Sequence, residues 1–294
     1  MLGTGAGYSL PTVNWLRFPG PDDPAGTEPE PQWPLEAILD GAAAAGFTSV
    51  GLDRHTVATY VAAGRSIDDV GAELRARGLR CTDVGVLPLG TAGVLGVAEE
   101  LAGIAEASGA GICIAAHYAP TAFEAAARDL REAAAILAGA GATLVLEFVV
   151  YGPLRTLAEG AELCEAVGWN RCRLLVDTWH VFRGGEPLSR LRSLGDDRIG
   201  LVHVNDGAAV PDADAVLEGR SRRLLPGQGA FPLAEFAAAV DAAGYRGVVA
   251  VEVLSDELRR LSPAEGAREL MRSLRQSELM RSSTTTGISR DVRP

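Results

Sequence analysis

The chain of 294 residues lacks the features of several common protein classes. Its formal net charge is −11 with no visible basic face, whereas a protein that neutralises nucleic-acid phosphates needs one. It has no run of about 18 apolar residues that would cross a bilayer. Its N-terminus shows no charged segment followed by an apolar run, so no secretory signal is expected. We therefore predict a protein that binds neither nucleic acid nor a membrane.

Cysteine is scarce and scattered. The four cysteines, Cys81, Cys113, Cys164 and Cys172, form no Cys-x-x-Cys pair, which is typical of reduced core thiols in a cytoplasmic protein. A Gly-x-Ser-x-Gly nucleophile elbow, a P-loop and a His-Glu-x-x-His zinc pattern are also missing. The sequence thus gives no support to hydrolysis through a covalent serine or cysteine.

After a Pro-rich stretch from Pro19 to Pro34, the chain alternates short β-rich runs with Ala-rich helical runs. The pattern predicts strands near 3–10 and at 47–52, 79–86, 111–116, 143–149, 173–177, 199–204 and 248–254. It predicts helices at 35–45, 66–77, 94–108, 121–139, 155–167, 187–194, 232–243 and 263–276. Eight strands in strict alternation with helices, without a Gly-x-Gly-x-x-Gly turn, favour an α/β fold of the (β/α)₈ TIM barrel type over an open doubly wound sheet.

This barrel is expected to span residues 1–276 as one domain, and the polar segment 277–294 is expected to be disordered. Capping boxes are predicted at Thr121-Ala-Phe-Glu124 and at Ser262-Pro263-Ala-Glu265. Left-handed helix ends are predicted at the glycines that follow six of the helices, Gly46, Gly78, Gly109, Gly141, Gly168 and Gly244.

Apolar runs in four of the predicted strands end on a potential metal ligand, namely Glu147, Asp177, His203 and Glu252. Taken singly, an acid at a strand end is just as readily a helix N-cap or a surface charge. Four on neighbouring parallel strands can meet at one end of a barrel. Three carboxylates and one imidazole suit a divalent cation such as Mn²⁺, Mg²⁺ or Co²⁺. We predict a metal site there, with Glu147 and Glu252 as the catalytic pair that removes and returns a proton.

Further side chains are candidates for substrate binding. His180 is expected to reach the same pocket as a ligand or hydrogen-bond donor, or else to cap or pack, and Trp179 to form a wall. His117, after the fourth strand, is a candidate to line the pocket or to bind a second metal. His55 either packs or reaches the rim. Asp206 is either an acceptor for the second nitrogen of His203 or a cap.

A long connection from Asn205 to Phe231 follows the strand that ends at His203, on the expected active-site face. Arg222 and Arg223 in this loop are candidates to hold a substrate hydroxyl, carboxylate or phosphate, unless the loop is merely a solvated basic segment.

Five short pieces of the chain resemble the xylose isomerase-like barrel superfamily of sugar isomerases and epimerases, inosose and dehydroshikimate dehydratases, and apurinic-site endonucleases. They are Leu146-Glu147, Asp177-Thr-Trp-His180, His203-Val-Asn-Asp206, Leu225-Pro-Gly-Gln-Gly229 and Val251-Glu252-Val-Leu-Ser-Asp256. The resemblance implies one divalent metal, most often Mn²⁺, on Glu147, Asp177, His203 and Glu252. It also implies that His180 and an arginine of the long loop contact substrate oxygens. The endonuclease branch holds three zinc ions with additional histidines, and this chain has only four histidines in all.

The leading hypothesis is a metal-dependent isomerase or epimerase of a sugar or keto-polyol, working through a metal-stabilised enediolate. Mg²⁺, Co²⁺, Zn²⁺ and Fe²⁺ are alternatives to Mn²⁺. The second hypothesis is a dehydratase of a cyclic keto-polyol, such as an inosose or a dehydroshikimate-like compound. The third is a ligand-binding barrel without catalysis, in which the four ligands would be vestigial. A homodimer is expected from the resemblance alone.

Overall fold

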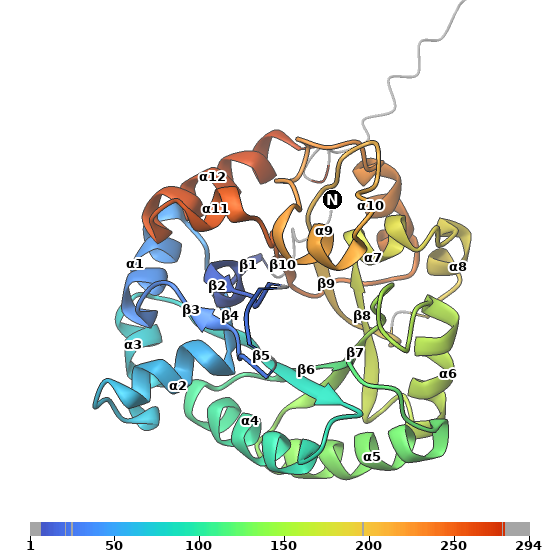
Figure 1. The fold of residues 1–294 in the computed structure, drawn as a ribbon, viewed down its shortest axis with the longest axis horizontal. Helices are drawn as coiled ribbons and strands as arrows, with labels where there is room; N and C mark the ends of the chain where they lie inside the picture. The colour runs from blue at the N-terminus through green and yellow to red at the C-terminus, as the bar shows by residue number, and fades with distance from the viewer. Residues whose placement is uncertain (1–6, 21, 25, 196, 278, 280–294) are drawn as a thin grey trace, which may run out of the picture.

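The computed structural model describes residues 7–20, 22–24, 26–195, 197–277 and 279. Eight parallel strands close into a barrel in the order β1-β10-β9-β8-β7-β6-β5-β4 (Figure 1). Their bounds are Tyr8–Pro11 (β1), Ser49–Asp53 (β4), Arg80–Leu89 (β5), Ile112–His117 (β6), Thr143–Glu147 (β7), Cys172–Asp177 (β8), Ile199–Val204 (β9) and Val249–Val251 (β10). Strand β1 pairs with both β10 and β4 and so closes the ring. The predicted (β/α)₈ barrel is confirmed.

Helices surround the barrel on its outside (Figure 1). Those of the outer layer are Leu35–Ala45 (α1), Arg54–Ala62 (α2), Val70–Ala76 (α3), Val94–Ser108 (α4), Phe123–Gly139 (α5), Leu157–Val167 (α6), Leu188–Arg192 (α8), Leu233–Ala242 (α10) and Pro263–Gln276 (α12). Short helices Thr178–Arg183 (α7), Ala215–Ser221 (α9) and Asp256–Arg259 (α11) follow strands β8, β9 and β10. Among the described residues, no helix combines the length and apolar character needed to cross a bilayer.

The predicted helix ends are largely confirmed. All six glycines predicted to end helices have positive φ angles. At α12, Ser262 and Glu265 form the predicted capping box, with Pro263 at the first helical position. The box predicted at Thr121 is wrong. The backbone stays extended through Ala122, so α5 begins at Phe123 and Glu124 lies one position too early to reach back.

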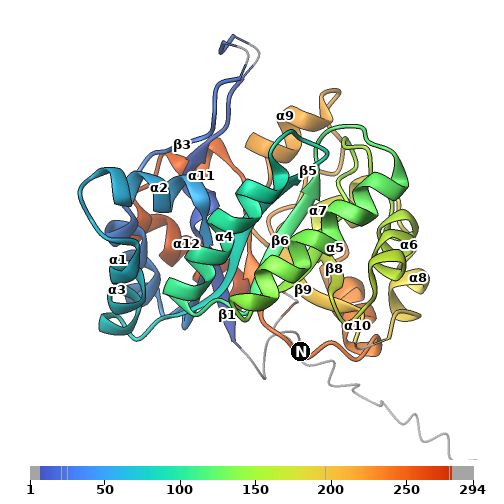
Figure 2. The same ribbon diagram turned by 90° about the horizontal axis from the view of Figure 1, so that it is seen from below.

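A small antiparallel pair, Leu16–Arg17 (β2) and Glu30–Pro31 (β3), lies within and beside the Pro-rich stretch. The segment between them projects beyond the barrel at the end where α9 also lies (Figure 2). Two predictions fall largely outside the described residues: the start of the first strand, at 3–6, and the disordered tail, at 278 and 280–294. All four cysteines are buried and free.

A small apolar cluster of Ile114, Val145, Leu175 and Leu201 is separate from the main core between strands and helices. Three of these residues lie two positions before Glu147, Asp177 and His203. Because side chains two apart on a strand point to the same face, the cluster lies directly below the polar strand ends, inside the barrel. The fold therefore provides an apolar floor under the candidate site.

Candidate metal centre

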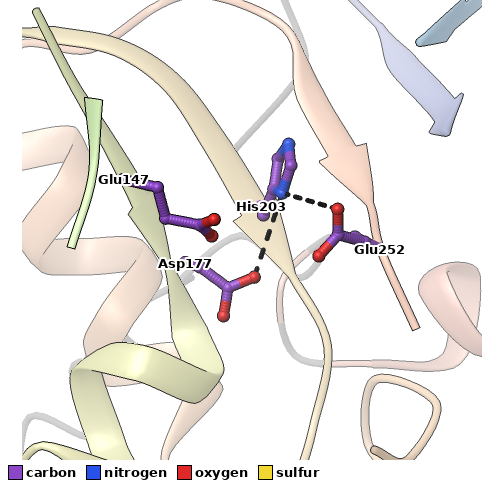
Figure 3. A group of neighbouring side chains, drawn as sticks. All are labelled: Glu147, Asp177, His203 and Glu252. Carbon is purple, nitrogen blue, oxygen red and sulfur yellow. Dashed lines mark ion pairs between the residues drawn. The ribbon is translucent and has the colours of Figure 1, made fainter. Parts of the chain in front are cut away.

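The four predicted ligands converge at the C-terminal end of the barrel. Glu147 ends β7, Asp177 ends β8, His203 lies in β9, and Glu252 directly follows β10. One ligand atom of each lies within 4.8 Å of those of the others. Glu147 and Glu252 reach the cluster from opposite sides, with His203 and Asp177 between them (Figure 3). The closed strand order explains this convergence, because β7 to β10 are consecutive neighbours.

Asp177 has two separate functions in the fold. Its Oδ1 accepts hydrogen bonds from the backbone N–H groups of Trp179 (2.6 Å) and His180 (3.3 Å), and so caps α7. Its Oδ2 faces the cluster, 3.9 Å from Nδ1 of His203. The helix start thus fixes the carboxylate in one orientation, with one oxygen directed at the site.

Asn205, to which the sequence assigned no function, holds this arrangement together. Its Nδ2 donates to Oδ1 (3.2 Å) and Oδ2 (3.0 Å) of Asp177 and to the backbone carbonyl of Glu252 (3.1 Å). The Thr178 hydroxyl donates to Oδ1 of Asn205 at 2.8 Å, which orients the amide. The signal for Asn205 was its place in His203-Val-Asn-Asp206, two residues beyond a ligand and directly after the end of β9.

The cluster concentrates negative charge in a buried place. Burial, together with Glu252 and Asp177, raises the pKa of Glu147 to about 8. Burial opposes ionisation of both His203 and Glu252, but their mutual attraction dominates, with Nδ1 and Oε1 3.4 Å apart. It raises the pKa of His203 to about 9 and lowers that of Glu252 to about 2. Without a cation, the protons bound by Glu147 and His203 reduce the negative charge of the cluster.

The donor set fits a divalent cation. Oε1 of Glu147 and Nε2 of His203 are buried and make no hydrogen bond within the described part of the chain. Buried polar atoms normally have a partner, and a cation would supply one to carboxylate and imidazole alike. Glu147, Asp177, His203 and Glu252 are the residues that would hold it.

His180 lies beside Glu147. The backbone N–H of Val150 points at its Nδ1 from 3.4 Å, and its Nε2 lies 3.7 Å from Oε1 of Glu147. Burial lowers the pKa of His180 to about 4. A neutral ring that accepts at Nδ1 carries its proton on Nε2, so His180 presents a donor to the site. Trp179 is fully buried behind it, with the rings edge-to-face and 5.1 Å apart.

The structure separates the two predicted arginines. Arg223 is buried, and its Nη1 donates to Oδ2 of Asp177 (3.0 Å) and Oε2 of Glu252 (3.1 Å), while its guanidinium lies 5.5 Å from the Trp179 ring. Burial opposes its charge, but the two carboxylates outweigh this and raise its pKa. Arg222 points away, pairs with Asp212, and has a side chain that is 55% exposed. Only Arg223 is brought to the cluster.

Three other predicted residues lie apart from the cluster. His117 is buried beside Gly90 and lines neither the cluster nor the cavity described below. His55 lines the cavity rim, 3.8 Å from Glu28. Asp206 is not the acceptor for His203. Its carboxylate instead accepts from the backbone N–H groups of Gly207, Gly227, Gly229 and Phe231, over 2.8–3.0 Å.

This last contact explains the Pro226-Gly-Gln-Gly229 sequence. A Cβ at Gly229 would lie 2.3 Å from Oδ1 of Asp206, so only glycine allows the backbone to approach the carboxylate. We call the contact between Asp206 and these four N–H groups the Asp206 clasp. It folds the long loop back to its own start.

A cavity of about 560 Å³ opens over the cluster. Its lining includes Glu147, Glu252, His180 and Arg223. It also includes Arg220 on α9, one of the arginines of the long loop, and three aromatic residues for which no function was predicted: Tyr118 after β6, Tyr151 after β7, and Phe18 from the segment between β2 and β3. The cavity is large enough for a small polyhydroxylated molecule.

Comparison with known proteins identifies a matching family and several similar proteins. A family model described as xylose isomerase-like TIM barrel matches residues 39–277. A 3-dehydroshikimate dehydratase of Pseudomonas aeruginosa is 31% identical over 150 residues, which cover 50% of this chain and 23% of the relative. An inosose isomerase of Halalkalibacterium halodurans is 28% identical over 130 residues, covering 44% of this chain and 45% of the relative. The matches thus span less than half of either relative.

Among solved structures, one described as the IOLI protein with a binding zinc atom superposes with a TM-score of 0.76. It is 16% identical, and the match covers 91% of this chain and 96% of that one. At this identity the likeness concerns the fold.

Proposed function

The chain belongs to the xylose isomerase-like TIM barrel family, and we propose that it is a divalent-metal-dependent isomerase or epimerase of a sugar or keto-polyol. The observation that carries this proposal is the placement of Glu147 and Glu252 on opposite sides of one small cluster (Figure 3). Two carboxylates that flank a substrate carbon allow one to take its proton and the other to return one.

The bound cation would stabilise the negative charge that develops on the substrate oxygens as the proton leaves, and so acidify the adjacent C–H bond. Glu147 is the proposed proton acceptor, because no arginine or lysine pairs with its carboxylate within the described residues, whereas Arg223 pairs with Glu252. Glu252 is held by Arg223 and by His203, which keep its carboxylate in place on the other side.

His180 and Arg223 orient the substrate in this proposal. The Nε2 proton of His180 can donate to a substrate oxygen next to Glu147. Arg223 uses Nε for the backbone carbonyl of Gly219 and Nη1 for Asp177 and Glu252. It lines the cavity, so its Nη2 group can donate to a substrate oxygen there. The named activity of one relative, an inosose isomerase, supports proton transfer on a polyhydroxylated ketone.

The second candidate is a dehydratase. In that reaction the same base removes the proton, and a β-hydroxyl then leaves as water. The observation that favours it is the match to two bacterial proteins named 3-dehydroshikimate dehydratase, 31% and 32% identical over 150 and 124 residues. Both reactions share the first proton transfer and therefore the same cluster.

The test is metal content followed by proton exchange. Wild type, Glu252→Gln and Glu147→Gln are purified in parallel, and metals are measured by mass spectrometry. About one equivalent of divalent metal is expected in wild type, and less in Glu252→Gln. Ketoses, inososes and 3-dehydroshikimate are then incubated with the metal-loaded protein in D₂O.

Deuterium at the carbon next to the carbonyl, in an isomerised product, supports the isomerase. Loss of water with an enone or aromatic product supports the dehydratase. No metal in any variant, even after incubation with Mn²⁺, would refute both and favour a barrel that only binds a ligand.

A further inference from the structure

Arg220 lies near the end of α9 and lines the cavity over the metal centre. The other two arginines of this cavity are engaged by carboxylates. Arg54 pairs with Glu100 at 2.9 Å and Glu28 at 3.8 Å, and Arg223 pairs with Asp177 and Glu252. Among the described residues, Arg220 has no carboxylate within 4.0 Å. It is a cation of the cavity wall without a matching anion.

Aromatic rings, rather than acids, hold Arg220 in place. Its guanidinium lies 5.8 Å from the Phe18 ring centroid and 5.9 Å from that of Tyr151. Arg259 donates a hydrogen bond to the backbone carbonyl of Arg220 at 2.6 Å. The guanidinium of Arg259 also lies 5.4 Å from the centroid of the Phe18 ring. Cation–π contacts use the charge but few of the five N–H donors. One donor reaches the Tyr151 hydroxyl, and the others are left for a ligand.

The carboxylates that line the cavity have partners other than Arg220. None of the three carboxylates of the cluster pairs with Arg220, because Asp177 and Glu252 face Arg223 and His203, and Glu147 faces His180. Across the cavity, both oxygens of Asp53 accept hydrogen bonds from Thr12 and Thr56. A half-buried cation without a partner is stabilised when a ligand supplies the opposite charge.

We propose that Arg220 binds a carboxylate of the substrate, and that the substrate class is therefore an acidic keto-polyol rather than a neutral sugar. This inference rests on the proposed function only in placing the substrate in this cavity. A single planar guanidinium matches a carboxylate through two parallel N–H donors. A phosphate carries the same charge chemistry, and the experiment separates the two.

The experiment compares two cyclic polyols, quinate and myo-inositol, of which only quinate carries a carboxylate. Both lack the ketone, so neither turns over, and their affinities for the Mn²⁺-loaded full chain are measured by calorimetry. Inorganic phosphate forms a third arm. The variants are Arg220→Gln, Arg220→Lys and, as a matched control, Arg246→Gln. Arg246 is likewise an arginine, but it pairs with an acid, Asp241, and lies at the exposed connection between α10 and β10, away from the cavity.

Quinate is expected to bind more tightly than myo-inositol. Arg220→Gln should weaken quinate roughly ten- to a hundred-fold, the value of a hydrogen bond to a charged group, and leave myo-inositol unchanged. Arg220→Lys should retain part of the affinity, and Arg246→Gln all of it. In wild type, added salt should weaken quinate alone, which tests the charge without any variant.

Equal affinity for quinate and myo-inositol, equal loss of both in Arg220→Gln, or failure of quinate to bind would overturn the proposal. Phosphate that competes better than quinate would overturn the assignment to a carboxylate. Failure of the proposed function shows itself differently, as the lack of proton exchange in every ketone, and it leaves these affinities untouched.

Discussion

The strands of the barrel form two adjacent sets whose C-terminal ends differ in chemistry. Strands β7, β8, β9 and β10 each bring one ligand to the cluster. Strands β1, β4, β5 and β6 end at Pro11, Asp53, Leu89 and His117, none of which belongs to it. Both sets are parallel strands of one closed barrel, so position at a strand end does not by itself make a residue functional.

Asp53 and Asp177 show that the partners of the second carboxylate oxygen decide whether a strand-end acid belongs to the site. Each ends a strand and caps the following helix. Asp53 accepts from the Thr56 N–H at Oδ1 (2.8 Å) and from the hydroxyls of Thr12 (2.5 Å) and Thr56 (2.6 Å) at Oδ2. Oδ2 of Asp177 instead meets Arg223 and Asn205, at the cluster. The second oxygen is used by the fold in one case and directed at the site in the other.

The largest expected effect comes from substituting these two acids in the same way. Asp177→Asn removes a charged ligand and should lower kcat by about 10²–10⁴-fold and reduce bound metal. Asp53→Asn should retain metal and activity but cost about 1–3 kcal/mol of stability, because its buried hydroxyl partners lose their acceptor. Metal analysis, steady-state kinetics and urea unfolding of both variants check this.

Loss of metal in Asp53→Asn, as expected for Asp177→Asn, would contradict the contrast between these two acids. The two strand-end acids would then belong to one site, and the separation of the barrel into two sets would be wrong.

A smaller effect on stability is expected from a change of pH, and it arises only from residues of the metal cluster. Glu147, with a pKa of about 8 against an ordinary 4.5, holds a proton in the folded protein that the unfolded chain has released. His203, at about 9 against 6.5, does the same. Their contributions are thus present at low pH and are lost as pH rises to between 8 and 9. The metal-free protein should lose on the order of a few kcal/mol between pH 6 and 9.

Thermal melting of the chelator-treated protein across this range measures the slope. Added Mn²⁺ should stabilise more as pH rises, because the cation takes the place of the protons. Glu147→Gln should flatten the slope up to pH 8, and an unchanged slope in this variant would contradict the assignment.

The smallest effect is expected at Arg222, next to Arg223 in the long loop. Its exposed pair with Asp212 should contribute no more than about 0.5 kcal/mol, so Arg222→Gln should match wild type in stability and metal content. Arg223→Gln, in contrast, leaves Asp177 and Glu252 without their shared cation. Unfolding and metal analysis of the two variants decide whether the neighbours differ as the structure indicates.

The sequence predicted the barrel and the cluster because both depend on local patterns. An apolar run that ends on Glu147, Asp177 or His203 indicates both a buried strand and a potential metal ligand near the C-terminal end of that strand. Helix α2 was missed because Arg54-His-Thr-Val-Ala-Thr-Tyr-Val-Ala62 lacks a strong apolar stripe and depends on Asp53 as its cap. The cavity wall could not be predicted, because Phe18, Tyr151 and Arg220 are far apart in the chain and meet only through tertiary packing.

Prediction also failed to separate Arg222 from Arg223, since nothing in two adjacent arginines tells which way each side chain points. Asp206 was placed near His203 by sequence distance alone. The structure shows that three of its four partners come from 21 to 25 residues further on.

The Asp206 clasp makes the long loop an exchangeable unit. One carboxylate joins residue 206 to residues 227, 229 and 231, so the segment between them is a closed lobe with fixed ends. Lengthening such a lobe costs little, about 0.6 kcal/mol for each doubling. Position 220 lies between these fixed ends, in the part of the lobe that lines the cavity. Exchange of its side chain should therefore change what the cavity offers a ligand and leave the four metal ligands of the barrel in place.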